Sequence, residues 1–284
     1  MHPTPSRPQP LSALRRALSF LPFVALCVAC KAAPPAPDGP TTQKAQQVTV
    51  VADEQPLEYL EVITGNAPES EALPLVVAIH GLGDAPDRFQ GLFKFFNVPA
   101  RIIIPKAPTA HGPGFSWFPV GALKGDDVPK ETTDGILKSA IRITRLMDQV
   151  AREKATLGKP IVTGFSQGGI LSFAIALHHP ESISMALPIS GALPKSLWVK
   201  GDTKMPPIKA FHGGTDQRVP VAAARAMVKQ LAEDGATAEI QLFRVGHRMN
   251  AAMRGAWAEA LAAQLDVLNP PSFKPLLKQA PAPK

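Results

Sequence analysis

Short apolar runs alternate with longer segments of helical periodicity between residues 48 and 268. The runs predicted to be strands are Val48–Val51, Leu57–Ile63, Leu75–Ile79, Arg101–Ile104, Pro160–Thr163, Met185–Ile189, Ile208–Phe211 and Glu239–Phe243. Most are nearly continuous in apolar residues, as expected of parallel strands covered on both faces, and strands that alternate with helices indicate βαβ units. The pattern predicts one α/β domain at 48–268, with a mostly parallel central sheet, helices on both faces and an opening antiparallel pair.

Four longer segments are predicted to be helices. They are Thr132–Lys154, Gln167–His178, Val221–Asp234 and Ala251–Leu265. In the first, apolar residues recur close to helical spacing, which favours an amphipathic helix, and Thr132 or Thr133 is expected to cap it. Gly235 follows the third segment and supplies a helix stop.

Residues 1–29 have the pattern of a targeting segment rather than of the domain. Arg15 and Arg16 precede an apolar run that ends at small residues and is too short to span a bilayer. Cys30 follows Leu26-Cys27-Val28-Ala29, which resembles the lipobox of bacterial lipoproteins, although Cys27 stands where a lipobox usually has Leu. We therefore expect export in a bacterium. Lipidation of Cys30 would attach the protein to a membrane, whereas an ordinary secretory segment would leave it periplasmic or secreted.

Proline-rich segments flank the domain. Residues 30–47 are rich in Pro, Ala, Thr and Gln and are predicted to be a flexible linker, and residues 269–284 are predicted to be a disordered tail rich in Pro and Lys. Both cysteines of the chain lie in or beside the targeting segment, so no disulfide is expected in the domain. The formal charge of the chain is +7, and it falls to +4 when residues 1–29, which contain three Arg and no acidic residue, are removed. So small a positive excess predicts no nucleic-acid partner.

The sequence Gly164-Phe165-Ser166-Gln167-Gly168 fits the Gly-x-Ser-x-Gly pattern of a nucleophile elbow, in which a strand turns sharply into a helix and exposes a serine. A predicted strand leads into it and a predicted helix leads out. The start of that helix directs N–H groups and the positive end of its dipole toward any anion near Ser166. The alternative is a glycine-rich turn with an idle serine, which leaves this strand and helix context unexplained. Ser166 is therefore the candidate nucleophile.

A serine hydroxyl needs a base, and the base needs a carboxylate that fixes its tautomer. His247 is the candidate base because it follows the last predicted strand. Of the other downstream histidines, His178 and His179 end a helix and His212 begins a turn, where it is placed to orient the acid loop. Asp216 is the candidate acid because it follows the strand Ile208–Phe211; a turn or helix-cap role is its alternative.

Acyl transfer also needs N–H donors for the tetrahedral oxyanion. The Gln167 N–H follows the nucleophile and supplies one donor. We expect the Leu82 N–H to be the second, because two glycines in the turn His80-Gly-Leu-Gly-Asp84 allow close approach of the backbone. His80 precedes the serine and is expected to hold this turn by a hydrogen bond rather than to act as the base.

The motifs found in this way are His80-Gly-Leu-Gly-Asp84, Gly164-Phe-Ser-Gln-Gly-Gly169, Ser190-Gly191, His212-Gly-Gly-Thr-Asp216 with Val219-Pro220, and Gly246-His247. Together they resemble the phospholipase/carboxylesterase family that includes acyl-protein thioesterases. The resemblance implies an α/β-hydrolase fold and short- to medium-chain acyl esters or thioesters as substrates. It also implies a triad of Ser166, Asp216 and His247, with Leu82 and Gln167 as oxyanion donors. No metal or organic cofactor is implied.

The segment between residues 106 and 130 carries several aromatic side chains beside glycines. The resemblance places a substrate-facing Trp in this loop, so Trp117 and Phe118 are the candidates for lining the substrate pocket. Covering the sheet is an equal alternative for both, because aromatic side chains dominate cores as readily as clefts.

These observations predict a serine carboxylic ester hydrolase that acts through an acyl-enzyme on a small-molecule or lipid ester of short to medium acyl chain. Lysophospholipase or acyl thioesterase activity shares the chemistry and differs in pocket length and leaving group. Export suggests a further alternative, an esterase acting on polyesters or feruloyl-type plant-cell-wall esters. A non-catalytic surface binding lipoprotein would be expected to carry a damaged triad, and no damage is visible in the motifs.

Overall fold

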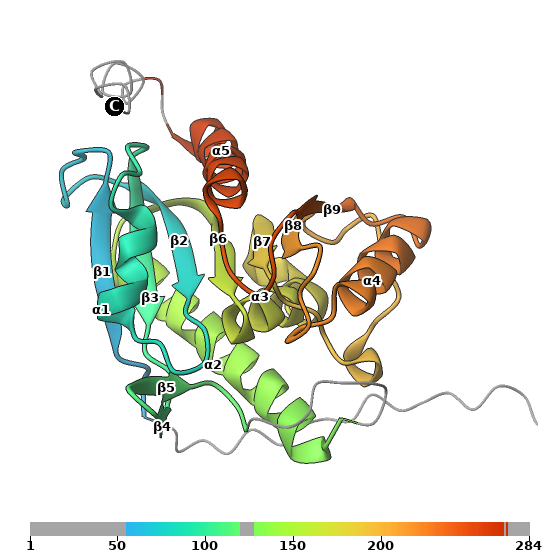
Figure 1. Cartoon of the computed structure of the whole chain (residues 1–284). Helices are drawn as coiled ribbons and strands as arrows, with labels where there is room; N and C mark the ends of the chain where they lie inside the picture. The colour runs from blue at the N-terminus through green and yellow to red at the C-terminus, as the bar shows by residue number, and fades with distance from the viewer. Residues whose placement is uncertain (1–54, 120–127, 270, 272–284) are drawn as a thin grey trace, which may run out of the picture. The chain divides into compact units, whose positions relative to one another are not determined.

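Among the described residues of the computed structural model, seven strands form one sheet in the order β1-β3-β2-β6-β7-β8-β9 (Figure 1). The structure describes residues 55–119, 128–269 and 271. The strands of the sheet are β1 (Tyr59–Thr64), β2 (Leu73–Ile79), β3 (Ala100–Pro105), β6 (Thr156–Phe165), β7 (Met185–Ile189), β8 (Ile208–Gly213) and β9 (Ala238–Phe243). A separate antiparallel pair consists of β4 (Thr109–His111) and β5 (Gly114–Ser116).

The helices connect successive strands and cover the sheet. They are α1 (Pro86–Phe89), α2 (Lys130–Glu153), α3 (Gln167–His178), α4 (Val221–Glu233) and α5 (Ala251–Leu268), with short 3-10 turns at Gln90–Phe93, Pro180–Ser182 and Lys195–Leu197. None of the helices in the described part of the chain is long and apolar enough to cross a membrane.

The sheet is parallel except at one edge. β1 runs antiparallel to β3, with Tyr59 opposite Pro105 and Thr64 opposite Ala100, whereas the other neighbouring strands pair in parallel. Because parallel strands all end at the same edge, the loops after β2, β6, β8 and β9 meet at the carboxyl end of the sheet. This edge holds every motif that the sequence singled out for catalysis.

The alternation of side chains along β2 explains how both faces of the sheet are covered. Leu75, Val77 and Ile79 contribute to a buried cluster with apolar residues of α2, α3 and α4. Val76 and Ala78 point the other way, into a second cluster that contains apolar residues of α1 and α5. A continuous apolar run is therefore required, because each successive side chain enters one core or the other.

The structure confirms the predicted fold class, a mostly parallel sheet with helices on both faces. The predicted strands from Leu57 onwards all exist, and their bounds move by a few residues. The expected cap of α2 is wrong, because the helix begins at Lys130 after Pro129 and has no side-chain cap. Thr132 and Thr133 lie inside its first turn instead; the Thr132 hydroxyl donates to Pro119 O and the Thr133 hydroxyl to Lys130 O.

Several sequence expectations fall outside the described residues. They concern the targeting segment 1–29, Cys30, the linker 30–47, the strand Val48–Val51 and, apart from residues 269 and 271, the tail.

Candidate active site

Ser166 lies at the sharp turn between β6 and α3, where the sequence predicted a nucleophile elbow. Its backbone has φ of 57° and ψ of −113°, a conformation that non-glycine residues rarely adopt. The Ser166 N–H donates to Ile189 O at 3.0 Å, and Ser166 O accepts from the Ile170 N–H at 2.9 Å. The neighbouring strand and the helix therefore hold the serine in a strained position with its hydroxyl half-exposed.

Both glycines of the elbow are needed because the turn is packed directly against the end of β2. A Cβ atom built on Gly168 would lie 1.9 Å from Ile79 O, and one built on Gly164 would lie 2.6 Å from the same oxygen. Gly81, in the loop after β2, is also close: its Cβ would stand 3.4 Å from Ser166 Cβ. The loops after β2 and β6 thus meet at backbone distance, which brings the Leu82 segment beside the serine.

Three side chains that are far apart in the sequence converge at this point. The Ser166 hydroxyl lies 2.8 Å from His247 Nε2, and His247 Nδ1 lies 2.7 Å from Asp216 Oδ2. Asp216 is on the loop after β8, and His247 is on the loop between β9 and α5. Because the carboxylate only accepts, His247 Nδ1 carries a proton and Nε2 is free to accept the proton of the hydroxyl.

The Asp216 carboxylate is fully buried and held by its own loop. Oδ1 accepts from the Arg218 N–H and from the Val219 N–H, each at 3.0 Å, which leaves Oδ2 for His247. His212 Nε2 donates to Val219 O at 3.0 Å and lies 3.5 Å from Asp216 Oδ2. The sequence placed His212 where it could orient this loop, and the contact with Val219 O does so. Burial lowers the pKa of His212, so its imidazole is neutral at pH 7.

The two expected oxyanion donors are available for a ligand. Within the described residues, neither the Leu82 N–H nor the Gln167 N–H donates to another protein group. The neighbouring amides are occupied, since Gly83 N–H donates to Phe115 O and Asp84 N–H donates to Gly81 O. Gln167 is the first residue of α3, so its N–H also lies at the positive end of a helix dipole.

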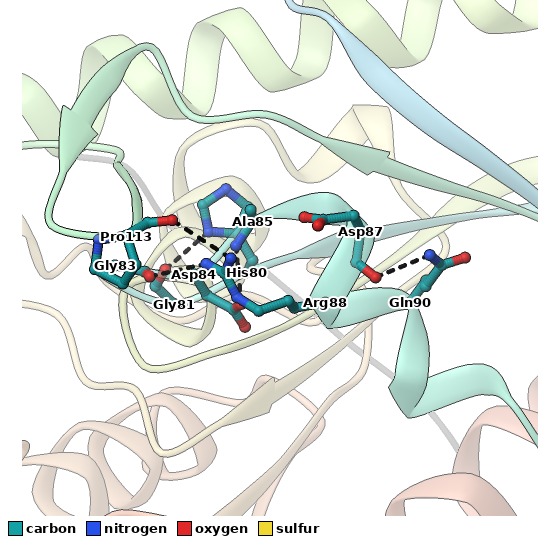
Figure 2. Close-up of polar contacts among 9 residues, drawn as sticks. All are labelled: His80, Gly81, Gly83, Asp84, Ala85, Asp87, Arg88, Gln90 and Pro113. Carbon is teal, nitrogen blue, oxygen red and sulfur yellow. Dashed lines mark hydrogen bonds and ion pairs between the residues drawn. The ribbon is translucent and has the colours of Figure 1, made fainter.

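His80 holds the turn after β2, as expected, and its tautomer follows from its contacts. Nε2 accepts from the Ala107 N–H at 3.2 Å, so the proton is on Nδ1, which donates to Gly81 O at 2.8 Å (Figure 2). The side chain is completely buried, and burial lowers its pKa, which keeps the imidazole neutral. His80 therefore fixes the carbonyl immediately before Leu82, and its side chain takes no proton from the serine.

The Gln167 side chain has a role that sequence reasoning missed. Its Oε1 accepts from the Trp117 N–H at 3.0 Å, and its Nε2 donates to Phe118 O at 3.1 Å and to Ser116 Oγ at 3.2 Å. These bonds tie the loop after β5 to the elbow across about fifty positions of the chain. The Gly-x-Ser-x-Gly pattern leaves the middle residue unspecified, so no local pattern could have predicted this contact.

Trp117 and Phe118 lie in the core rather than beside the reacting groups. Each is 3% exposed, and both belong to the buried cluster that contains α2 and α3. The indole Nε1 of Trp117 donates to His80 O at 3.0 Å, and this bond helps to hold the turn after β2. Of the two readings of this loop, the structure favours the one in which the aromatic side chains cover the sheet, and the expectation that they line the pocket is not supported.

One hollow is lined by His247, and a second lies beside the loop that carries Asp216. A groove of about 360 Å³ is lined by His247 and Phe165, and a second of about 610 Å³ is lined by Leu193, Val219 and other largely apolar residues of the β7–α4 region. Val219 donates to Asp216, so the second groove adjoins the acid loop. Within the described residues, no group of three or more His, Cys, Asp or Glu side chains is arranged to hold a metal ion.

The class of protein follows from the comparison of the whole domain. Residues 57–263 match the phospholipase/carboxylesterase family, a match over more than half of the chain, and the protein belongs to this family of hydrolases. Its fold is the α/β-hydrolase fold.

Individual relatives agree with this membership. A probable inactive carboxylesterase of Oryza sativa subsp. japonica is 28% identical over 208 residues, which cover 67% of this chain and 83% of the relative. The carboxylesterase SOBER1 of Arabidopsis thaliana is 27% identical over 194 residues, covering 63% of this chain and 85% of SOBER1.

Solved structures share the fold. Esterase PE8 superposes with a TM-score of 0.63 at 21% identity, over 76% of this chain and 100% of PE8. Acyl-protein thioesterase 2 of Zea mays gives a TM-score of 0.60 at 22% identity, over 73% of this chain and 99% of that protein. At this level of identity the likeness concerns the fold.

Proposed function

We propose that this protein is a serine esterase that hydrolyses carboxylic esters of short to medium acyl chain, with Ser166 as nucleophile, His247 as general base and Asp216 as the orienting carboxylate. The observation that carries the proposal is the pair of consecutive hydrogen bonds, 2.8 Å and 2.7 Å long, that joins these side chains. Activation of a serine hydroxyl at neutral pH requires such an arrangement. It also opposes the non-catalytic alternative.

In the proposed reaction, Ser166 Oγ attacks the carbonyl carbon of the ester while its proton passes to His247 Nε2. The tetrahedral oxyanion accepts hydrogen bonds from the Leu82 and Gln167 N–H groups, which have no other partner in the described chain. When the intermediate collapses, the bond to the leaving oxygen breaks and His247 gives its proton to the departing alcohol. A water molecule then attacks the acyl-serine with His247 as base, releasing the carboxylic acid and restoring Ser166.

The groove beside the acid loop is the proposed binding site for the acyl chain. Its volume of about 610 Å³ lies in the range of ligand pockets, and much of its lining is apolar, including Leu193, Trp198 and Val219. Such a lining favours a hydrocarbon chain over a polar group. The length of this groove is expected to set the preferred acyl chain.

The test of the proposed function uses Ser166→Ala. The purified wild-type protein is expected to hydrolyse p-nitrophenyl esters, with matched thioesters included to compare leaving groups, and to take up a fluorophosphonate label. The variant is expected to lose on the order of 10⁶-fold in kcat and all labelling, because the nucleophile is gone. Ser172→Ala is the matched control, since Ser172 is buried within α3 and its hydroxyl donates to Gly168 O. Undiminished labelling of Ser166→Ala would refute the assignment.

We also propose that residues 1–29 direct export in a bacterium and that Cys30 is lipidated. The basic pair, the short apolar run and the lipobox-like sequence before Cys30 support this. Wild-type protein is expected in the membrane fraction, and Cys30→Ala is expected to be released from it. Cys30→Ser, which keeps a small polar side chain but cannot be lipidated, is expected to be released as well, and identical fractionation of all three proteins would reject the anchor.

A further inference from the structure

The groove beside His247 carries an excess of positive charge. Its volume is about 360 Å³, and its lining includes Phe165, His247, Asp84, Arg88, Arg248 and Arg254. Three of these side chains are guanidinium groups and one is a carboxylate. The rest of the lining is mainly apolar, so the groove combines hydrophobic and positively charged residues.

One of the three arginines is already occupied. Arg88 Nε lies 3.1 Å from Asp84 Oδ1, and its terminal nitrogens donate to Gly83 O at 3.1 Å and Pro113 O at 3.4 Å (Figure 2). This arginine balances the charge of Asp84 and ties the oxyanion loop to the loop that precedes β5. It therefore contributes little free charge to the groove.

The other two arginines are not balanced in this way. Arg248 and Arg254 are exposed, and in the part of the chain that the structure describes neither forms an ion pair or a side-chain hydrogen bond. A guanidinium group presents a planar fork of donors that matches carboxylate and phosphate oxygens. Two such forks on one groove favour an anionic ligand over a neutral one.

The position of the groove shows which part of an ester would enter it. His247 lines the groove, and the proposed mechanism has the imidazole return its proton to the leaving oxygen. The leaving group must therefore lie on the imidazole side of the serine. Arg248 directly follows His247 in the chain, and the Arg248 N–H donates to Gly246 O at 2.9 Å, so both residues belong to one turn.

We propose that this groove is a leaving-group subsite that binds a carboxylate or phosphate through Arg248 and Arg254, so that the preferred substrates are esters with an anionic alcohol part. This inference rests on the proposed esterase function and adds the substrate class. Arg248 and Arg254 are specificity-determining residues, and the apolar lining accommodates the carbon skeleton between the scissile ester and the anion.

The test compares esters that share one acyl group. The butyrate monoester of ethylene glycol is paired with O-butyrylglycolate, and 1-butyrylglycerol is paired with its 3-phosphate, so that the two pairs separate carboxylate from phosphate recognition. Butyrate release is followed at constant pH in wild type, Arg248→Gln/Arg254→Gln and the control Arg225→Gln. Arg225 is exposed on α4 and lines neither groove, so the control removes one positive charge away from the site.

Wild-type protein and Arg225→Gln are expected to prefer at least one anionic ester, through a lower KM. In the double variant the ratio of kcat/KM for the anionic over the neutral ester should fall about tenfold, as expected for the loss of two exposed charge-assisted contacts. Raising the ionic strength should erode the wild-type preference. Equal ratios in wild type and double variant would overturn the subsite while leaving the esterase intact. If the wild-type protein hydrolyses none of the four esters, the result would instead count against the proposed function.

Discussion

Two buried groups of charged side chains stand out among the residues that the structure describes, and their contacts lead to different places. At the carboxyl end of the sheet, Asp216 is buried on a loop and its contacts lead outward, through His247, to a half-exposed hydroxyl. At the antiparallel edge, Arg101 is buried within β3, where it pairs with Glu61 of β1 and donates to Glu69 O at 2.8 Å.

The difference lies in where the contacts of each group end. Arg101 contacts only other protein groups of the described chain, and its partner Glu61 forms a second ion pair with Lys154 at 3.2 Å. The pair between Arg101 and Glu61 joins β3 to β1. The contacts of Asp216 end at Ser166, which is held in a strained conformation. In this protein the buried charge inside β3 therefore serves the pairing of β1 with β3, whereas the buried charge on the loop after β8 belongs to the candidate active site.

The sharpest test of this contrast is Asp216→Asn. Asn retains an oxygen to accept from the Arg218 and Val219 N–H groups, but its amide faces His247 Nδ1 and favours the tautomer that cannot accept the serine proton. We expect kcat to fall by about 10⁴-fold, with only a minor change in the thermal unfolding midpoint. Ester hydrolysis and calorimetry measure the two effects. A variant with a much lower unfolding midpoint but undiminished kcat in the folded state would place Asp216 with Arg101 as a structural charge.

The next largest effect concerns the close packing that positions the serine. Gly168→Ala places a methyl group 1.9 Å from Ile79 O, a backbone atom that cannot move without displacing β2. The unfolding free energy should fall by about 3 kcal/mol or more, and esterase activity should fall with it.

Gly255→Ala on α5 is the matched control for that substitution, because a Cβ there would meet nothing within 4 Å. Replacing a helical glycine without a clash should raise the unfolding free energy by up to about 1 kcal/mol. Denaturant titration of both variants decides the point. If Gly168→Ala is as stable as Gly255→Ala, the close approach of the elbow to β2 is wrong.

The structural role of the buried Arg101 pair is tested by Arg101→Met. Removing the guanidinium leaves Glu61 with Lys154 as its remaining partner, so we expect the unfolding free energy to fall by about 3 kcal/mol while kcat/KM of the folded protein is retained. Lys106→Gln, which breaks the exposed pair between the same two strand regions, Lys106 with Glu58, should cost about 1 kcal/mol or less. Equal losses in the two variants would show that burial of the Arg101 pair carries no special weight.

The sequence was informative wherever a local pattern encodes the structure. The strand at Leu75–Ile79 was recognisable because its successive side chains enter two different cores, so all of them are apolar. The helix α3 was predicted with its observed bounds because the nucleophile elbow fixes its first residue. The small pair β4 and β5 was not predicted, because its strands are three residues each. Short segments of this kind lack an apolar period.

Contacts between distant residues account for the other omissions. Arg101 opens a run of isoleucines, so the strand was evident from the sequence. The ion-pair partner of Arg101, Glu61, lies forty positions earlier and could not be predicted. The hydrogen bonds of the Gln167 side chain to residues 116–118 and the bond from the Ala107 N–H to His80 also join distant residues, so they could not be predicted either. The convergence of Ser166, Asp216 and His247 was expected because chain order and strand ends constrain catalytic partners in this fold, and no such rule constrains a supporting hydrogen bond.

The smallest predicted effect concerns pH and the neutral imidazole at His80. Burial lowers the pKa of His80 in the folded protein, whereas an unfolded histidine titrates near 6.5. The folded state therefore binds fewer protons below this pH, and its stability is complete above about pH 6.5 and falls as the pH drops toward the lowered folded pKa. Each such histidine contributes a slope of at most about 1.4 kcal/mol per pH unit.

His80→Gln preserves an acceptor for the Ala107 N–H but cannot titrate. We expect the unfolding free energy of this variant to decline less steeply than that of wild type between about pH 6.5 and pH 5. The residual slope comes from His178, His179 and His212, whose pKa values burial also lowers. His111→Gln, which removes an exposed imidazole, is the matched control. An unchanged slope in His80→Gln would mean that this histidine is accessible to protons, and the turn that presents Leu82 would then be less tightly held than the structure shows.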